Sequence, residues 1–212
     1  MYNKGVDSVH PLSRVKEGFG MNICVYGAAS DNIADVYKKA GEELGEELAK
    51  RGHALIFGGG ASGMMGAAAR GASRGGGRIT SIAPSFFDVD GVLYPECDEY
   101  IFTETMRERK QKLDELSDCF VISPGGVGTF DEFFEILTLR QLNRHQKPIA
   151  ILNTEGYYEY MLAMMKNAAD QHFMTPLNFD LFYVSDRVED ILDYLENPGD
   201  IYHGISELRD LK

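Results

Sequence analysis

The chain has 212 residues, of which 44% are hydrophobic and 25% charged, as is typical of a globular protein with one full core. Its formal net charge of −12 argues against nucleic acid as a partner, because the phosphate backbone binds basic surfaces. No apolar run is long enough to span a membrane, and the three cysteines and five histidines lack the spacing of a metal site. We therefore expect a cytoplasmic protein that uses no metal and no membrane.

The chain divides into three parts. Residues 1–20 form a predicted polar N-terminal arm, 21–196 form the folded domain, and 197–212 form a predicted polar C-terminal tail. Short apolar runs bounded by glycine or polar residues predict strands at 22–26, 54–57, 79–83, 100–102, 119–122, 148–152 and 181–184. Helical periodicity predicts helices at 35–50, 64–74, 105–116, 130–142, 157–171 and 188–195.

The alternation of strands and helices predicts a single α/β domain, a Rossmann-like parallel sheet flanked by helices on both faces. The strands are nearly continuous apolar runs, as expected for strands that are covered on both sides. In such sheets a ligand binds beyond the carboxyl ends of the strands. Both glycine-rich turns of the chain lie at that predicted edge.

The second glycine turn, residues 123–129, is the most informative stretch of the chain. It joins a buried strand to an apolar helix, so its backbone amides and the helix dipole favour a bound anion. Gly125, Gly126 and Gly128 let the backbone approach a phosphate without a Cβ in the way. The hydroxyl of Thr129 caps the helix or contacts the same anion.

Glu132 follows this turn and has two interpretations. Thr129 and Glu132 fit the T-x-x-E pattern of a capping box, in which the glutamate serves the helix alone. Alternatively, Glu132 is a catalytic carboxylate one turn beyond a phosphate site. Spacing does not decide between the two.

The first glycine turn, residues 58–63, matches G-x-G-x-x-G. The strand that follows it ends in Pro84 without a carboxylate for ribose hydroxyls, which argues against NAD, and no Gly-Lys-Ser/Thr makes a Walker A loop. The turn is either a tight packing connection or a phosphate site formed by Gly59 and Gly60. Two such turns at one sheet edge suggest one phosphorylated molecule held between them.

A basic cluster lies on the predicted helix 105–116. It consists of Arg107, Arg109, Lys110 and Lys112, and Thr105 with Glu108 forms a second capping-box pattern. The cluster is either a solvated helix face or a site where the Arg109 guanidinium grips phosphate oxygens bidentately.

Residues 58–66, 106–110 and 124–132 together resemble the Lonely Guy family of cytokinin riboside 5′-monophosphate phosphoribohydrolases. The resemblance covers the chain from Met21 to about Leu195 and rests on an M-x-x-R-K motif followed by P-G-G-x-G-T-x-x-E. It implies a Rossmann-like fold, at least a homodimer, no cofactor, and Arg109 and Glu132 as the catalytic pair. The substrate-binding residues that we expect are Ser30, Gly59, Gly60, Met106, Lys110, Gly125, Gly126, Gly128 and Thr129.

The resemblance implies a hydrolase that cleaves the N-glycosidic bond of AMP or an N6-modified purine nucleoside 5′-monophosphate, giving free base and ribose 5-phosphate. Arg107 replaces a frequent histidine and Val127 a frequent aromatic residue, departures that concern base preference. No residue context marks a lysine for a pyridoxal Schiff base, although many members were once labelled lysine decarboxylases. The alternatives are a nucleotide-binding carrier without catalysis and a nucleosidase of broad monophosphate specificity.

Overall fold

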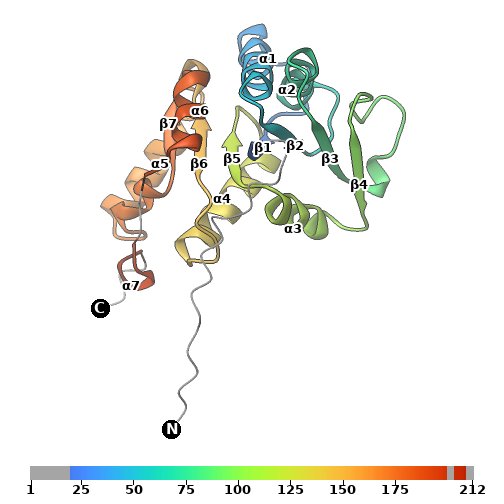
Figure 1. The fold of residues 1–212 in the computed structure, drawn as a ribbon. Helices are drawn as coiled ribbons and strands as arrows, with labels where there is room; N and C mark the ends of the chain where they lie inside the picture. Colours follow the sequence, from blue (N-terminus) through green and yellow to red (C-terminus); the bar gives the residue numbers. More distant parts are fainter. Residues whose placement is uncertain (1–19, 200–202, 209–212) are drawn as a thin grey trace.

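The computed structural model describes residues 20–199 and 203–208 (Figure 1). The predicted arm therefore lies outside the described residues except for Gly20. In the described part, seven parallel strands form one sheet in the order β4-β3-β2-β1-β5-β6-β7. The strands are β1 Asn22–Tyr26, β2 Ala54–Phe57, β3 Ile79–Pro84, β4 Glu99–Thr103, β5 Cys119–Ile122, β6 Ile149–Leu152 and β7 Tyr183–Ser185.

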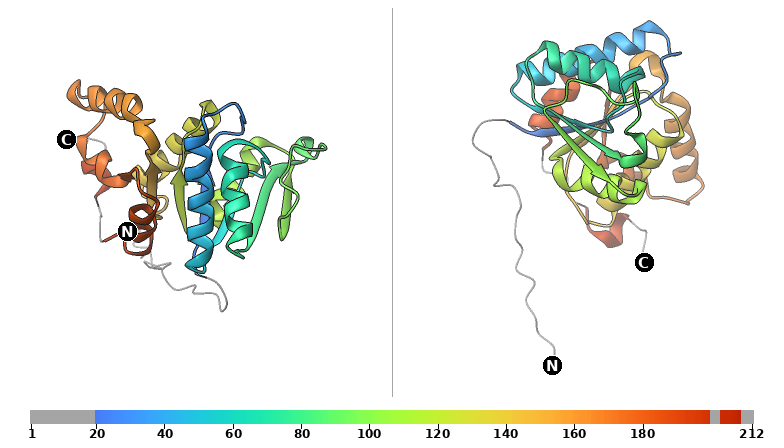
Figure 2. Two further views of the ribbon diagram at one scale, coloured as in Figure 1. Left: turned by 90° about the horizontal axis from the view of Figure 1, so that it is seen from above. Right: turned by 90° about the vertical axis from the view of Figure 1, so that its right-hand side faces the viewer.

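Helices cover both faces of the sheet (Figures 1 and 2). They are α1 Asp35–Lys50, α2 Gly63–Arg74, α3 Met106–Leu116, α4 Val127–Gln141, α5 Glu159–Asp170, α6 Val188–Glu196 and α7 Ile205–Leu208. Three short 3-10 helices, η1 Ser85–Phe87, η2 Thr154–Gly156 and η3 Pro176–Leu181, lie in the connections. Helices α1, α2 and α6 pack on one face, and α3, α4 and α5 pack on the other.

Two apolar cores result, one on each face of the sheet. Alternate residues of β1 divide between them, since Ile23 and Val25 join the core under α1 and α2 while Cys24 and Tyr26 join the core under α3 and α4. Every residue of β2, β3, β5 and β6 is buried. This burial on both faces explains the apolar runs and confirms the predicted fold class.

The C-terminal region differs from the prediction in two places. The predicted strand 181–184 is shifted, because Leu181 ends η3 and β7 begins at Tyr183. The predicted polar tail contains α7, and its Leu208 is 1% exposed and packs in the core on the α4 side. Apolar burial of one residue thus attaches this part of the tail to the domain.

The strand order reverses between β1 and β5, which makes this the topological switch point of the sheet. The turns that leave these two strands are hydrogen bonded to each other. The amide of Ser123 donates to the carbonyl of Tyr26 at 2.9 Å, and the amide of Ala28 donates to the carbonyl of Pro124 at 3.0 Å. The second glycine turn is therefore fixed at the position where open α/β sheets bind ligands.

Candidate active site

A buried ion pair joins α3 to α4 at this switch point. Nη1 of Arg109 lies 2.7 Å from Oε1 of Glu132, and the two side chains are 7% and 10% exposed. Nε of Arg109 donates to the carbonyl of Ile82 at 3.2 Å. The third guanidinium nitrogen, Nη2, lies against Gly58, at the start of the first glycine turn. Arg109 is therefore no solvated surface residue, and it links the first glycine turn to the helix that follows the second.

The electrostatics of this pair suit a reactive carboxylate. Burial raises the pKa of the Glu132 carboxyl above its ordinary value, while the charge of Arg109 acts in the opposite direction. A buried charge of this kind persists only because it is paired and hydrogen bonded. A cleft of about 150 Å³ between α3 and α4 has Glu132 and Tyr26 in its lining, so space for water adjoins the carboxylate.

The capping-box interpretation of Glu132 is wrong. Helix α4 begins at Val127 with Gly126 as its N-cap, and no side chain caps it. Thr129 and Glu132 thus lie inside the helix, where both are buried. The second T-x-x-E pattern does form a capping box, in which Thr105 accepts from the amide of Glu108 at 3.2 Å and the Glu108 carboxylate accepts from the amide of Thr105 at 3.2 Å.

The second glycine turn has its carbonyl groups occupied and its amide groups free. The carbonyls of Ser123, Pro124 and Gly125 accept hydrogen bonds from the protein, and that of Gly126 accepts from the amide of Phe130 at 3.0 Å. In the described part of the chain, the amides of residues 125–129 donate to no acceptor. Free amides at a helix N-terminus form an anion site.

Gly126 and Gly128 have no packing reason to be glycine. A Cβ built at either position meets no atom within 4 Å. Neither residue has a positive φ angle, so a side chain is excluded by no backbone strain at these two positions. The space that their missing side chains leave lies beside the free amides, as a bound phosphate requires. Gly125 differs, because Thr129 packs against it.

The first glycine turn is largely closed by the protein itself. The amide of Ala61 donates to the carbonyl of Val92 at 2.9 Å, and the carboxylate of Asp31 accepts from the amide of Gly63 at 3.2 Å. Gly59 has a φ angle of +85°, and a Cβ at Gly60 would come within 2.7 Å of the terminal methyl of Met65. Backbone conformation accounts for Gly59, whereas the contact at Gly60 is with the flexible end of a side chain; substrate contact by Gly59 and Gly60 stays a prediction.

The other predicted binding residues lie around this centre. Ser30 is exposed in the turn after β1, and its hydroxyl accepts from the amide of Asn32 at 3.3 Å. Met106 begins α3 and is 42% exposed. The ammonium of Lys110 binds carboxylates on α4, those of Asp131 at 3.0 Å and Glu135 at 2.5 Å. Lys110 thus joins the two helices.

Sequence reasoning missed two tyrosines. Tyr157 donates its hydroxyl to the carbonyl of Gly125 at 2.7 Å, and Tyr158 donates to the carbonyl of Ser123 at 2.7 Å. The signal was their position directly after the apolar strand β6 and its turn, at the same sheet edge as the glycine turns. Gly58 was also missed as a contact of Arg109.

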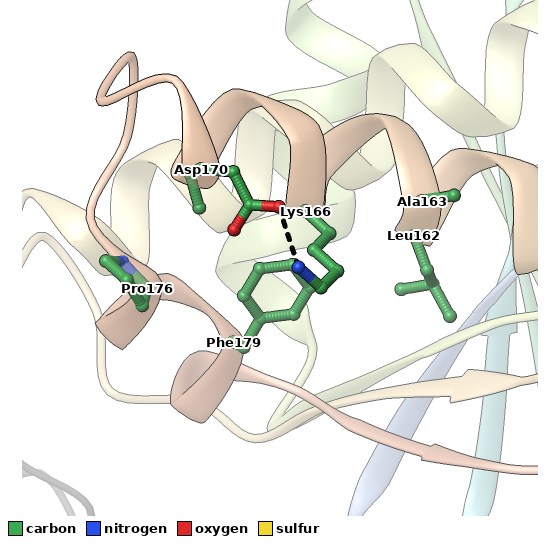
Figure 3. Close-up of a pocket in the computed structure, with 7 residues that line it drawn as sticks. Leu162, Ala163, Lys166, Asp170, Pro176 and Phe179 are labelled. Carbon is green, nitrogen blue, oxygen red and sulfur yellow. Dashed lines mark hydrogen bonds and ion pairs between the residues drawn. The ribbon is translucent and has the colours of Figure 1, made fainter.

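A larger groove, of about 500 Å³, lies elsewhere, between α5 and η3 (Figure 3). Its lining is mostly apolar, and its two charged residues, Lys166 and Asp170, pair with each other at 2.7 Å. It contains none of the predicted site residues. Among residues 20–199 and 203–208, no helix has the length and apolar character to cross a membrane, and no three side chains are grouped to hold a metal ion.

Comparison with known sequences gives consistent relatives. A family model described as "possible lysine decarboxylase" matches residues 65–195. A cytokinin riboside 5′-monophosphate phosphoribohydrolase of Arabidopsis thaliana is 32% identical over 186 residues, which are 86% of this chain and 80% of the relative. A cytokinin riboside 5′-monophosphate phosphoribohydrolase of Mycobacterium tuberculosis is 36% identical over 170 residues, 80% of this chain and 90% of the relative.

Comparison with solved structures supports the fold. A molybdenum cofactor binding protein of Rippkaea orientalis superposes with a TM-score of 0.65 at 21% identity, covering 84% of this chain and 98% of that one. The molybdenum cofactor carrier protein of Chlamydomonas reinhardtii gives a TM-score of 0.63 at 22% identity, covering 83% and 96%. At these identities the likeness concerns the fold alone.

Proposed function

The chain belongs to the Lonely Guy family, and we propose that it is a phosphoribohydrolase that cleaves the N-glycosidic bond of purine nucleoside 5′-monophosphates. The substrate is AMP or an N6-modified relative, and the products are the free base and ribose 5-phosphate. The observation that carries this proposal is the Arg109–Glu132 pair, 2.7 Å apart and buried one helical turn beyond a set of free amides.

The 5′-phosphate binds at the start of α4 in this proposal. The free amides of residues 125–129 supply hydrogen bonds, and the helix dipole favours the negative charge there. No acidic residue occupies the first turn of α4. Gly126 and Gly128 leave the space that the phosphate oxygens fill. The phosphate thus fixes the sugar above the switch point of the sheet.

Hydrolysis then requires water at C1′ of the ribose. Water attacks C1′ while the C1′–N bond breaks through an oxocarbenium-like state, and the base leaves with the bonding electron pair and takes up one proton from solvent to become the free base. The Glu132 carboxylate takes the proton of the attacking water or stabilises the positive charge on the sugar. Arg109 holds Glu132 in place and favours its ionised form against the effect of burial, and its Nη2 side orients the nucleotide.

We also propose that the protein acts as a homodimer and in the cytoplasm. Large apolar side chains are exposed in the single chain: Val127 at the start of α4 is 83% exposed, and Met164 on α5 and Phe173 after it are 57% and 87% exposed. A second copy of the chain would bury such a surface. The free thiols of Cys24, Cys97 and Cys119 support a reducing compartment.

The test measures base release from AMP and from isopentenyladenosine monophosphate by chromatography. We expect release by the native protein and a loss of about 10²- to 10⁴-fold in Glu132→Gln, with nucleotide binding retained. Glu189→Gln is the control, because Glu189 lies on α6, on the other face of the sheet, with its side chain 63% exposed. Near-normal turnover in Glu132→Gln contradicts the role of Glu132. Tight nucleotide binding without base release favours the carrier alternative.

A further inference from the structure

Two tyrosine hydroxyls hold the backbone of the second glycine turn from beneath. Tyr157 donates to the carbonyl of Gly125 and Tyr158 to the carbonyl of Ser123, each at 2.7 Å. The carbonyl between them, that of Pro124, accepts from the amide of Ala28 at 3.0 Å. Three successive carbonyls of the turn therefore accept hydrogen bonds from neighbouring parts of the domain.

The direction of a carbonyl fixes the direction of the next amide. The peptide group is planar and trans, so the N–H of one residue points away from the C=O of the residue before it. With the Gly125 carbonyl held by Tyr157, the Gly126 amide points away from Tyr157. In the described part of the chain this amide has no acceptor, and a Cβ at Gly126 would meet nothing within 4 Å. The hydroxyl of Tyr157 thus fixes the orientation of the Gly126 amide.

The turn between β6 and α5, which precedes these tyrosines, has a constrained backbone. It follows β6 and contains two successive residues with left-handed backbone, Glu155 at φ 54° and Gly156 at φ 67°. Such a conformation is costly for glutamate and persists only where the surrounding structure fixes it. The side chain of Asn153 accepts from the amide of Tyr158 at 2.7 Å and closes the turn.

Aromatic contacts fix the two rings. Tyr37 of α1 meets Tyr157 edge to face, with ring centroids 5.8 Å apart. Phe130 of α4 meets Tyr158 in the same way, at 6.3 Å. Tyr158 is fully buried, whereas Tyr157 is 38% exposed. Tyr157 can therefore lose its hydroxyl without leaving a cavity in the core.

We propose that Tyr157 and Tyr158 are positioning residues that orient the amides of the second glycine turn toward the 5′-phosphate of the substrate. This proposal deepens the proposed function and rests on it for the identity of the nucleotide. In this proposal the tyrosines contact neither the base nor C1′ of the nucleotide. Their loss therefore lowers the affinity for the phosphate and leaves kcat nearly unchanged.

The test compares Tyr157→Phe with Tyr160→Phe. Tyr160 lies on α5 only three residues further on and is 90% exposed, which makes its hydroxyl the matched control. We expect Tyr157→Phe to raise the KM for AMP by roughly three- to ten-fold, the worth of one hydrogen bond, with kcat changed by less than about two-fold. Tyr160→Phe is expected to match the native protein.

A binding measurement separates this proposal from the proposed function. Calorimetry with ribose 5-phosphate is expected to show the same three- to ten-fold loss of affinity in Tyr157→Phe, and adenine binding is expected to be unchanged. If the native protein releases no base from AMP but Tyr157→Phe still loses affinity for ribose 5-phosphate, the proposed function fails and the positioning role stands. Native affinity for ribose 5-phosphate in folded Tyr157→Phe overturns the positioning role, whether or not the native protein is active.

Discussion

The guanidinium group of Arg109 occupies the space that a side chain at Gly58 would need. A Cβ built at Gly58 would fall on Nη2 of Arg109, with the central carbon of the guanidinium 3.0 Å away. The other two nitrogens of the same group bind Glu132 and the carbonyl of Ile82. The end of β2 thus sets the position of an arginine on α3, and through it the position of a glutamate on α4.

Gly58→Ala should therefore inactivate the protein through Arg109. The methyl group displaces the guanidinium, and a displacement of about 1 Å in a catalytic group costs on the order of 10²-fold in activity. Measurement of kcat/KM for AMP, with circular dichroism to verify folding, tests this expectation. The double variant with Glu132→Gln is the control, since both changes act on one pair and should not add. Full additivity would show that Gly58 acts elsewhere.

Gly128→Ala should separate stability from function. Its Cβ meets no protein atom within 4 Å, and alanine in a helix is favoured over glycine by about 0.5–1 kcal/mol. We expect an unchanged or higher free energy of unfolding in urea, together with a loss of at least about ten-fold in affinity for ribose 5-phosphate, because the methyl group fills the anion space. Unchanged affinity in the variant would place the phosphate away from the start of α4.

The pH profile of the reaction should report Glu132. Burial raises the pKa of this carboxyl above its ordinary value of 4.5, and the charge of Asp131 raises the pKa further. The proposed role requires the ionised form, so activity is expected to fall as the pH falls through the raised pKa. The acidic limb of kcat/KM should thus lie above pH 4.5, and Asp131→Asn should move it to lower pH. A limb below pH 4.5 contradicts the assignment.

The same raised pKa has a consequence for folding. The folded state binds the Glu132 proton more tightly than the unfolded state does, so the contribution of this group to the free energy of unfolding decreases as the pH rises from 4.5 through the raised pKa. Glu132→Gln should remove that part of the pH dependence. Urea titrations of the native protein and of Glu132→Gln at several pH values from 4.5 upward measure this contribution to the free energy of unfolding.

The order of the helices and strands and the fold class could be predicted from apolar patterns along the chain. Each predicted strand overlaps an observed strand, and helix α1 has the predicted bounds, 35–50. Burial along one element follows from the spacing of apolar residues in that element, so periodicity is sufficient. The glycine turns lie at the carboxyl edge of the sheet because each directly follows the carboxyl end of a strand, β2 or β5, and all strands of the sheet are parallel.

The role of each local motif depends on contacts between elements that are distant in the sequence. The T-x-x-E pattern makes a capping box at Thr105 and Glu108 but not at Thr129 and Glu132, because α4 already begins at Val127. Arg109 meets Glu132 across 23 residues of chain, and Tyr157 meets Gly125 across 32. Such contacts depend on how the crossovers bring separate elements to one sheet edge. No local spacing encodes that distance, and burial of the Arg109–Glu132 pair is what distinguishes Arg109 from a residue on a solvated helix face.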